Sequence, residues 1–310
     1  MAYRLEREES VVGGLKRVVT NEIESASDHL SGKKKINRDK AVHEARKSIK
    51  KVRALLRLMR GELGEVFDDE NGHLRDIAGR LSELRDAFVM VQSLDALRKL
   101  YAKDAGTKLR AIRAGLLRKR SECARPQDIA NVLEDAATAL SRARKRAQTW
   151  PLKTDGYDAI APGFEGIYRA GRKALKKAHK HPSPDNFHHL RKRVKDHWYH
   201  VRLLENLWTD VMSAYEKSLK DLETWLGDDH NLTVLKERIL AEPAYYGSEK
   251  DIDLLFGLID KHQKELRDKA LALAARIYEQ KPRQMTQHMN HLWETWRSEP
   301  RVAADAISAA

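Results

Sequence analysis

The 310-residue sequence predicts an all-α fold made of two four-helix bundles that are related by a pseudo-twofold axis. Three observations support this prediction. Apolar residues recur at intervals of three and four along much of the chain, as on the buried face of an amphipathic helix. Only 16 Gly and 8 Pro interrupt the chain, which favours long helices over a fold with many turns. Two stretches also resemble each other at a constant offset of 145 residues, which indicates an internal repeat.

The repeat is clearest between residues 42–60 and residues 187–205, which align without a gap. These two stretches preserve basic positions rather than apolar ones. The five identical basic pairs are His43/His188, Arg46/Arg191, Lys47/Lys192, Lys50/Lys195 and Arg57/Arg202. The alignment continues in register into residues 74–90 and 219–235, so we expect the same helix lengths and the same turn in both halves.

We expect about four helices in the first half, residues 1–150. The basic helix should begin near Asn37 and Asp39, because both are residue types that cap helix N-termini. Its buried stripe runs from Val42 to Met59 at helical spacing. The segments with helical periodicity are 11–31, 42–60, 74–90, 104–122 and 127–148.

The boundary between the halves is expected between Trp150 and Gly156, so residues 151–310 should form the second bundle. Capping residues around Ser183 mark the start of its basic helix, and Ser248 begins a capping-box pattern. The helical segments here are 157–180, 187–205, 219–235, 249–279 and 283–297. One continuous helical array is the alternative, and the sequence does not separate the two arrangements well.

Positive charge is concentrated in two segments. The chain carries a net charge of +13, whereas residues 33–60 carry +10 and residues 169–202 carry +9. The rest of the chain is therefore slightly acidic, with a net charge of −6. This distribution indicates a localised site for a polyanion and argues against general adhesion to acidic surfaces.

The repeated cations share one face of their helix. At about 100° per residue, His43 to Arg57 fall within an arc of about 100°, and the apolar stripe is centred roughly 140° away. Arg53 widens the basic stripe on one flank. Like charges on one helix face repel each other, so we expect an anion to offset them.

Phosphate groups suit such a surface best. Arg offers a planar fork to phosphate oxygens, Lys offers a compact charge, and protonated His adds a titratable one. We therefore expect binding that weakens steeply with salt and strengthens toward pH 6. The helix before the second basic stripe adds further cations at helical spacing, among them Arg169, Arg172 and Lys173.

Three other functions were weighed. A nucleic-acid-binding protein is the main alternative, although no reading motif is evident and the basic stripe lacks interleaved aromatic residues. A metal site among His188, His189, His197 and His200 is disfavoured by loose spacing and cationic neighbours. An enzyme is also disfavoured, because neither a phosphate-binding loop nor a carboxylate cluster is visible. We expect no cofactor.

The expected location is the cytoplasm. Cys123 is the single cysteine, which excludes an internal disulfide framework and fits a reducing compartment. No apolar run approaches the roughly 18 residues that a membrane span needs, and the N-terminus lacks the apolar stretch of a signal peptide.

The pattern H-x-x-R-K-x-x-K occurs from His43 to Lys50 and again from His188 to Lys195. It resembles the opening motif of the CHAD family, the conserved-histidine α-helical domain family. Two later motifs of that family, described as turns, resemble residues 81–89 and residues 226–235. These segments contain Arg85 and His230.

The resemblance implies two four-helix bundles whose basic residues face a central groove. It also implies binding of inorganic polyphosphate and association with polyphosphate granules, and the chain looks like a standalone member. On this basis the conserved basic positions, Arg85 and His230 are expected to contact the ligand. The sequence departs from the family motifs at Ser82, Phe88 and Asn231, where the family has glycine, aspartate and aspartate.

Overall fold

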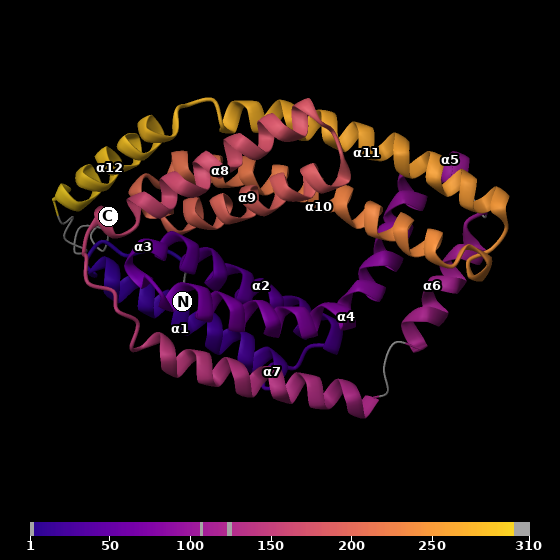
Figure 1. Cartoon of the computed structure of the whole chain (residues 1–310), viewed down its shortest axis with the longest axis horizontal. Coiled ribbons are helices and arrows are strands. Elements are labelled where there is room, and N and C mark those ends of the chain that lie inside the picture. The colour runs from indigo at the N-terminus through magenta and orange to yellow at the C-terminus, as the bar shows by residue number, and fades with distance from the viewer. Residues whose placement is uncertain (1–2, 106–107, 123–125, 301–310) are drawn as a thin grey trace, which may run out of the picture.

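The structure is a computed structural model that describes residues 3–105, 108–122 and 126–300, without the side chains of residues 83–87, 104 and 126. It confirms the predicted all-α fold, since all regular structure in these residues is helical (Figure 1). The helices up to residue 150 are α1 (Val11–Leu30), α2 (Arg38–Leu58), α3 (Arg60–Leu63), α4 (Val66–Leu100), α5 (Ala102–Ala105), α6 (Arg110–Glu122) and α7 (Pro126–Ala147). Those that follow are η1 (Tyr157–Ala159), α8 (Ala161–Lys180), α9 (Pro184–Leu203), η2 (Glu205–Leu207), α10 (Thr209–Ala241), η3 (Pro243–Tyr245), α11 (Glu249–Ile277) and α12 (Pro282–Ser298).

The basic helices begin where the capping residues predict. The side chain of Asn37 accepts a hydrogen bond from the Lys40 amide at 2.9 Å at the start of α2. Ser183 caps α9 in the same way through the Asn186 amide at 3.3 Å. Ser248 caps α11.

Two expectations about local structure were wrong. Residues 81–89 and 226–235 are not turns, because they lie inside the long helices α4 and α10. The helices expected over 74–90 and 219–235 are also much longer, at 35 and 33 residues.

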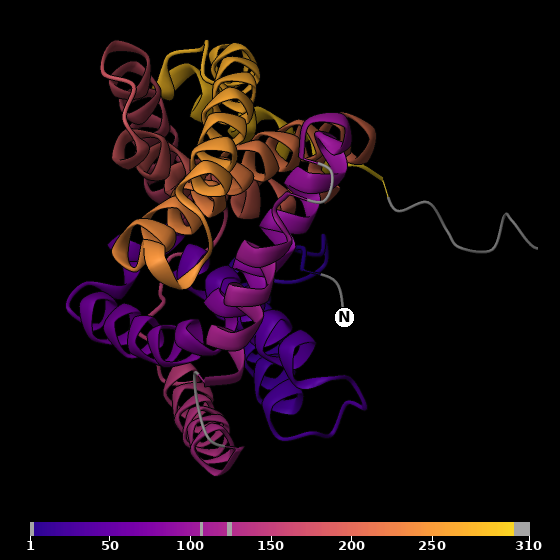
Figure 2. The ribbon, with the colours of Figure 1, turned by 90° about the vertical axis from the view of Figure 1, so that its right-hand side faces the viewer.

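Buried apolar side chains form two clusters. The larger one joins α1, α2, the first part of α4, α7, α8, α9, the first part of α10 and α12. The smaller one joins residues 90–116 with residues 232–266, at the end of the molecule that faces the viewer in Figure 2. Each cluster combines residues from before and after residue 150. The division into two units related by a twofold axis stays a prediction.

The basic helices α2 and α9 pack against each other within the larger apolar cluster. Helix α2 contacts both α8 and α9, and α10 contacts α9 and α4. The contact of α8 with α2 is very close at Gly163, where an added Cβ atom would lie 1.9 Å from the Leu58 carbonyl oxygen. Glycine at this position therefore lets the two backbones approach and brings the end of α2 alongside α8.

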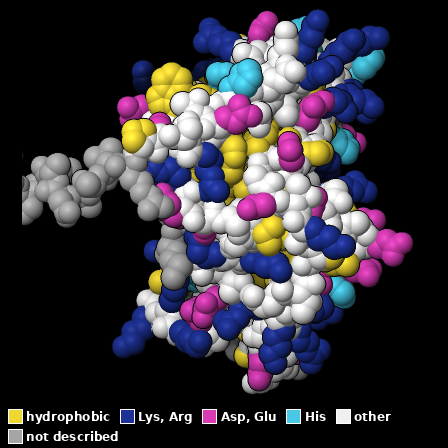
Figure 3. Space-filling model, turned by 90° about the vertical axis from the view of Figure 1, so that its left-hand side faces the viewer, with side chains coloured by type: hydrophobic (Ala, Val, Ile, Leu, Met, Phe, Trp, Pro, Cys, Tyr) yellow, Lys and Arg dark blue, Asp and Glu magenta, His cyan; other side chains and the backbone are white. Residues whose placement is uncertain are grey.

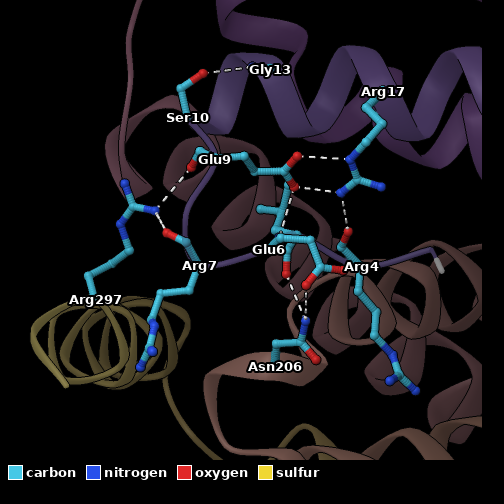
Figure 4. A network of polar contacts seen from close by, with 10 residues as sticks. Arg4, Glu6, Arg7, Glu9, Ser10, Gly13, Arg17, Asn206 and Arg297 are labelled. Carbon is cyan, nitrogen blue, oxygen red and sulfur yellow. Dashed lines mark hydrogen bonds and ion pairs between the residues drawn. The ribbon is translucent and has the colours of Figure 1, made fainter. Parts of the chain in front are cut away.

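The segment before α1 contacts the end of α9 and helix α12 (Figure 4). The Leu5 amide donates to the Leu203 carbonyl at 2.9 Å, and Arg4 pairs with Glu205 at 2.7 Å. Arg297 of α12 donates to the carbonyl oxygens of Arg7 and Glu9. The N-terminal segment thus packs on the end of α9 and on α12.

None of the helices in the described ranges combines the length and apolar character that a membrane-spanning segment requires.

Candidate functional site

Helices α2, α9 and α10 line one hollow with a volume of about 320 Å³, which we call the central hollow. It is lined mostly by cations that come from both basic helices. The lining residues are Arg46, Lys50, Arg53, Arg57, His188, Arg191, Lys192, Arg193, Lys195, Asp196, Tyr199 and His230. Two predicted stripes that are 145 residues apart in sequence therefore meet at one place.

Two smaller hollows adjoin the central one and share residues with it. One, of about 170 Å³, is bounded by Arg46, Lys50, Arg191 and His230 together with α4 residues such as Val89. The other, of about 220 Å³, adds His43 and Lys47 to Lys50, Arg191 and Lys195. His43 and Lys47 lie here beside Glu44, whose carboxylate is 2.5 Å from the Lys47 ammonium.

Glu223 of α10 is a buried carboxylate among these cations, and the sequence analysis missed it. Its oxygens lie 2.7 Å from the Lys195 ammonium, 3.0 Å from that of Lys220 and 3.5 Å from the Arg191 guanidinium. Burial alone would raise the pKa of Glu223, but these cations outweigh it and lower the pKa to about 2. Glu223 therefore stays ionised and holds Lys195 and Arg191 in place.

Asp196 is the second buried acid that the sequence analysis missed. Its carboxylate lies 3.1 Å from the Arg57 guanidinium of α2 and 3.7 Å from that of Arg193. Burial raises its pKa, and these arginines oppose the shift. The ion pair between Arg57 and Asp196 joins the two basic helices at the hollow.

Arg46 and Arg191, which align in the repeat, are held differently. Arg46 donates to the Ala78 carbonyl and to the Ser82 hydroxyl of α4. At Gly227, the position aligned with Ser82, an added Cβ would lie 3.4 Å from the Arg191 guanidinium. Ser82 thus serves as a hydrogen-bond acceptor for Arg46, which Gly227 cannot do for Arg191.

The comparisons with known proteins agree with this architecture. The family model of the CHAD domain matches residues 19–240, which is well over half of the chain. The chain belongs to the CHAD domain family. No curated protein matches the sequence.

A solved CHAD structure has the same fold. The crystal structure of the CHAD domain from the plant Ricinus communis covers 94% of this chain and 95% of its own, with a TM-score of 0.57 and 17% sequence identity. The CHAD fold therefore extends over almost the whole chain, including α11 and α12, which lie beyond the region matched by the family model.

His188 and His230 of this CHAD protein form a pair in the central hollow. Their ring centroids are 4.1 Å apart. Burial first, and nearby charges second, lower the pKa of each to about 4: Lys192 and Arg191 act on His188, and His188 and Arg191 act on His230. Both rings are therefore neutral at pH 6, so this pair does not account for the expected strengthening of binding toward pH 6 and would contribute to it only at lower pH.

Burial and neighbouring positive charges also lower the pKa values of Lys192 and Arg53. Burial, and then the charge of Arg193, lower the pKa of Lys192. Burial and the charge of Arg57 lower the pKa of Arg53 to about 10. Since each shift disfavours the charged form, a bound anion would relieve the repulsion.

Several predicted residues lie outside the central hollow. Arg169 pairs with Glu165, and Arg202 lies 3.7 Å from Glu216. Arg172 and Lys173 line a separate hollow between α8 and α11. The side chain of Arg85 is outside the described residues. Basic side chains elsewhere on the surface are mixed with carboxylates, as Figure 3 shows for one face.

The histidines weighed as a metal site occupy different environments. His197 is fully buried among Phe164, Tyr168 and Tyr215, and the Nε2 atom of His200 lies 2.9 Å from the Ala54 carbonyl oxygen. Across the described residues, no group of three His, Cys, Asp or Glu side chains is arranged to hold a metal ion.

Proposed function

We propose that the central hollow binds inorganic polyphosphate and that the protein is a non-catalytic binding protein in the cytoplasm. The observation that carries this proposal is the convergence of α2 and α9, because both basic helices line one hollow. Nine of the sixteen residues selected from the sequence line it. Membership of the CHAD family supports the choice of polyphosphate as the anion. The proposal extends to association with polyphosphate granules.

A linear anion suits the arrangement better than a single phosphate ion. The three adjoining hollows share Lys50 and Arg191, so basic side chains form a continuous surface from His43 to Arg57 along α2. These residues span 14 positions of a helix, or about 21 Å. A polymer with a charge on every phosphate can contact several of these cations at once and displace their counterions.

The cations differ in how strongly they are already engaged. Arg57 and Lys195 pair with buried carboxylates, whereas Lys192 has no ion-pair partner among the described residues. Lys192 also has a lowered pKa because of burial and of Arg193. An added phosphate would therefore give Lys192 an ion-pair partner, and its substitution disturbs no ion pair among the described residues.

The test is titration calorimetry of the full chain with long-chain polyphosphate at several salt concentrations. We expect saturable binding that weakens with salt, with a slope of roughly −0.7 per phosphate contacted if polyphosphate behaves like a single-stranded polyanion. Lys192→Gln should reduce the affinity roughly ten-fold and lower the salt slope by about one. Lys269→Gln is the matched control, because this exposed lysine of α11 lines none of the three adjoining hollows.

Competition identifies the polymer. Polyphosphate should displace duplex DNA from the protein at equal phosphate concentration, and orthophosphate should not displace polyphosphate. A preference for DNA would overturn the proposal in favour of a nucleic-acid-binding protein. Absence of heat and of competition at low salt would refute an anion site altogether, and release of phosphate from the polymer would refute the non-catalytic role.

A further inference from the structure

A second hollow lies between α8 and α11, and we call it the α8–α11 hollow. Its volume of about 720 Å³ is in the range of small-molecule sites, about 300–1,000 Å³. Its lining residues are Arg172, Lys173, Leu175, Lys176, His179, Leu271, Ala272, Ala275 and Tyr278. None of them lines the central hollow, so the proposed polyphosphate site does not account for it.

The two helices contribute different chemistry to this hollow. All of its basic residues come from α8, namely Arg172, Lys173, Lys176 and His179. Helix α11 and the residue that caps it contribute Leu271, Ala272, Ala275 and Tyr278. A ligand that fills the hollow therefore meets a cationic edge on one side and an apolar wall on the other.

The apolar wall is a continuous face of α11. Leu271, Ala275 and Tyr278 follow each other at steps of four and three residues, so they lie on one side of the helix over about 10 Å. Ala272 and Ala275 are exposed, and their short side chains leave the space that the hollow occupies. An unbranched apolar chain can lie along such a face.

The cations at the edge are not neutralised by the protein. Lys173 and Lys176 are exposed, and neither has an ion-pair or hydrogen-bond partner among the described residues. No Asp or Glu belongs to the described lining of the hollow. This contrasts with the central hollow, where Asp196 and Glu223 pair with Arg57 and Lys195.

Tyr278 joins the wall at the end of α11. The residue is 3% exposed, and its hydroxyl has no hydrogen-bond partner in the described part of the chain. At Gly171 of α8 an added Cβ would lie 2.5 Å from the Tyr278 ring and 2.6 Å from its hydroxyl, so the hydroxyl lies against α8 and the apolar part of the side chain contributes to the wall.

We propose that the α8–α11 hollow binds a free single-chain anionic amphiphile, with its apolar chain along α11 and its anionic head at the lysines of α8. Polyphosphate does not fit this site, because it has no apolar part to cover Leu271 and Ala275. An uncharged chain would leave the cations of α8 without a counterion. The inference is independent of the polyphosphate proposal.

The experiment is calorimetry of the full chain with sodium decanoate below its micelle-forming concentration. We expect saturable binding of one decanoate per chain, with weaker binding of butanoate and of decanol. Ala275→Trp, which fills the hollow from its exposed side, should abolish decanoate binding. The pair Lys173→Gln and Lys176→Gln should weaken decanoate at least ten-fold and leave decanol unchanged.

The matched control exchanges two other exposed lysines of the same helix, Lys177→Gln and Lys180→Gln, which do not line the hollow. This control should bind decanoate like the unmodified protein. Circular dichroism and polyphosphate titration of every variant show whether it is folded and whether the central hollow still works. Both readouts should be unchanged in Ala275→Trp.

Three results would overturn the proposal. Equal decanoate affinity in Ala275→Trp would place the binding elsewhere, and non-saturable binding would indicate detergent-like adsorption. Binding to anionic phospholipid vesicles without binding of decanoate would assign the α8 cations to a membrane surface. Failure of polyphosphate binding alone would refute only the proposed function.

Discussion

Removal of the Glu223 charge should destabilise the protein in a way that depends on pH. Glu223→Gln keeps the shape of the protonated acid but cannot ionise. The pKa of Glu223 is lowered from 4.5 to about 2, since burial, which raises it, is outweighed by Lys195, Arg191 and Lys220. The side chain is only 6% exposed, so solvent screens these contacts weakly.

The size of the effect follows from the two pKa values. A lowered pKa in the folded state contributes stability above the unfolded pKa, and this contribution is lost as pH falls toward the folded pKa. The shift corresponds to about 3 kcal/mol at pH 7 and about 1 kcal/mol at pH 3. Glu223→Gln should therefore lose about 3 kcal/mol of unfolding free energy at pH 7, in line with a broken buried ion pair.

The assay is urea unfolding of the protein and of the variant at pH 7 and at pH 3, followed by circular dichroism. Glu237→Gln is the matched control, because Glu237 is exposed on the same helix and has no described partner. It should change the unfolding free energy by less than about 0.5 kcal/mol at either pH. An equal loss for Glu223→Gln at both pH values would refute the reasoning, since the loss would then not come from ionisation.

Three further predictions concern the packing and the hollow. Gly163→Ala should lower the free energy of unfolding by about 3 kcal/mol or more, measured by thermal unfolding, because the added Cβ would meet the Leu58 carbonyl. Gly166→Ala is the control, since Gly166 lies on the same helix with open space around it, and this variant should be neutral or slightly stabilising. Polyphosphate affinity should rise more between pH 5 and pH 4 than between pH 7 and pH 6, because His188 and His230 have pKa values of about 4 and an anion favours their protonated forms. A calorimetric pH series measures this rise, and the double variant with Gln at both positions should flatten it. Asp196→Asn should raise polyphosphate affinity a few-fold at low salt, because it removes the carboxylate among the described lining of the central hollow, and a lower affinity in a correctly folded variant would contradict this.

The sequence was sufficient to predict that the fold is helical and which cations share one face of a helix, because both depend on local spacing. Each basic helix presents its cations on one face, as shown by Arg46 and Lys50 of α2 and by Arg191 and Lys195 of α9. The apolar stripe of each helix lies on another face and is buried. The expectation that the basic residues face one groove came from the resemblance to the CHAD family. The duplication itself and the twofold axis are still predictions.

The long helices were missed for a physical reason. Helix α4 contributes Leu74 and Leu81 to the larger cluster and Leu94 and Leu97 to the smaller one. Because its buried face changes along its length, a single apolar stripe does not mark the whole helix. The family motifs predict turns at residues 81–89 and 226–235, but these residues lie in the interior of helices α4 and α10.

The buried acids Glu223 and Asp196 were not predicted, because the cations that they contact are distant in sequence. A signal for Glu223 was present, since it lies between Leu222 and Leu226 on the buried stripe of α10. An acid at a core position needs a buried cation. Asp196 was similarly marked as the one acid within residues 186–202. Neither signal identifies Arg57 or Lys195 as the partner, because that depends on how α2, α9 and α10 pack.

The segment before α1 can complete its contacts only late in synthesis of the chain. Leu5 and Arg4 contact Leu203 and Glu205, and Arg297 contacts the backbone of Arg7 and Glu9. Residues 4–9 therefore lack these contacts until residues 203–297 have been synthesised, on the order of tens of seconds later at ordinary translation rates. Until then the apolar side chains of Tyr3 and Leu5, which are buried in the finished protein, lack their final partners. In nascent chains stalled before residue 203, added protease should accordingly cleave within residues 3–9, and the same residues should resist cleavage in the released protein.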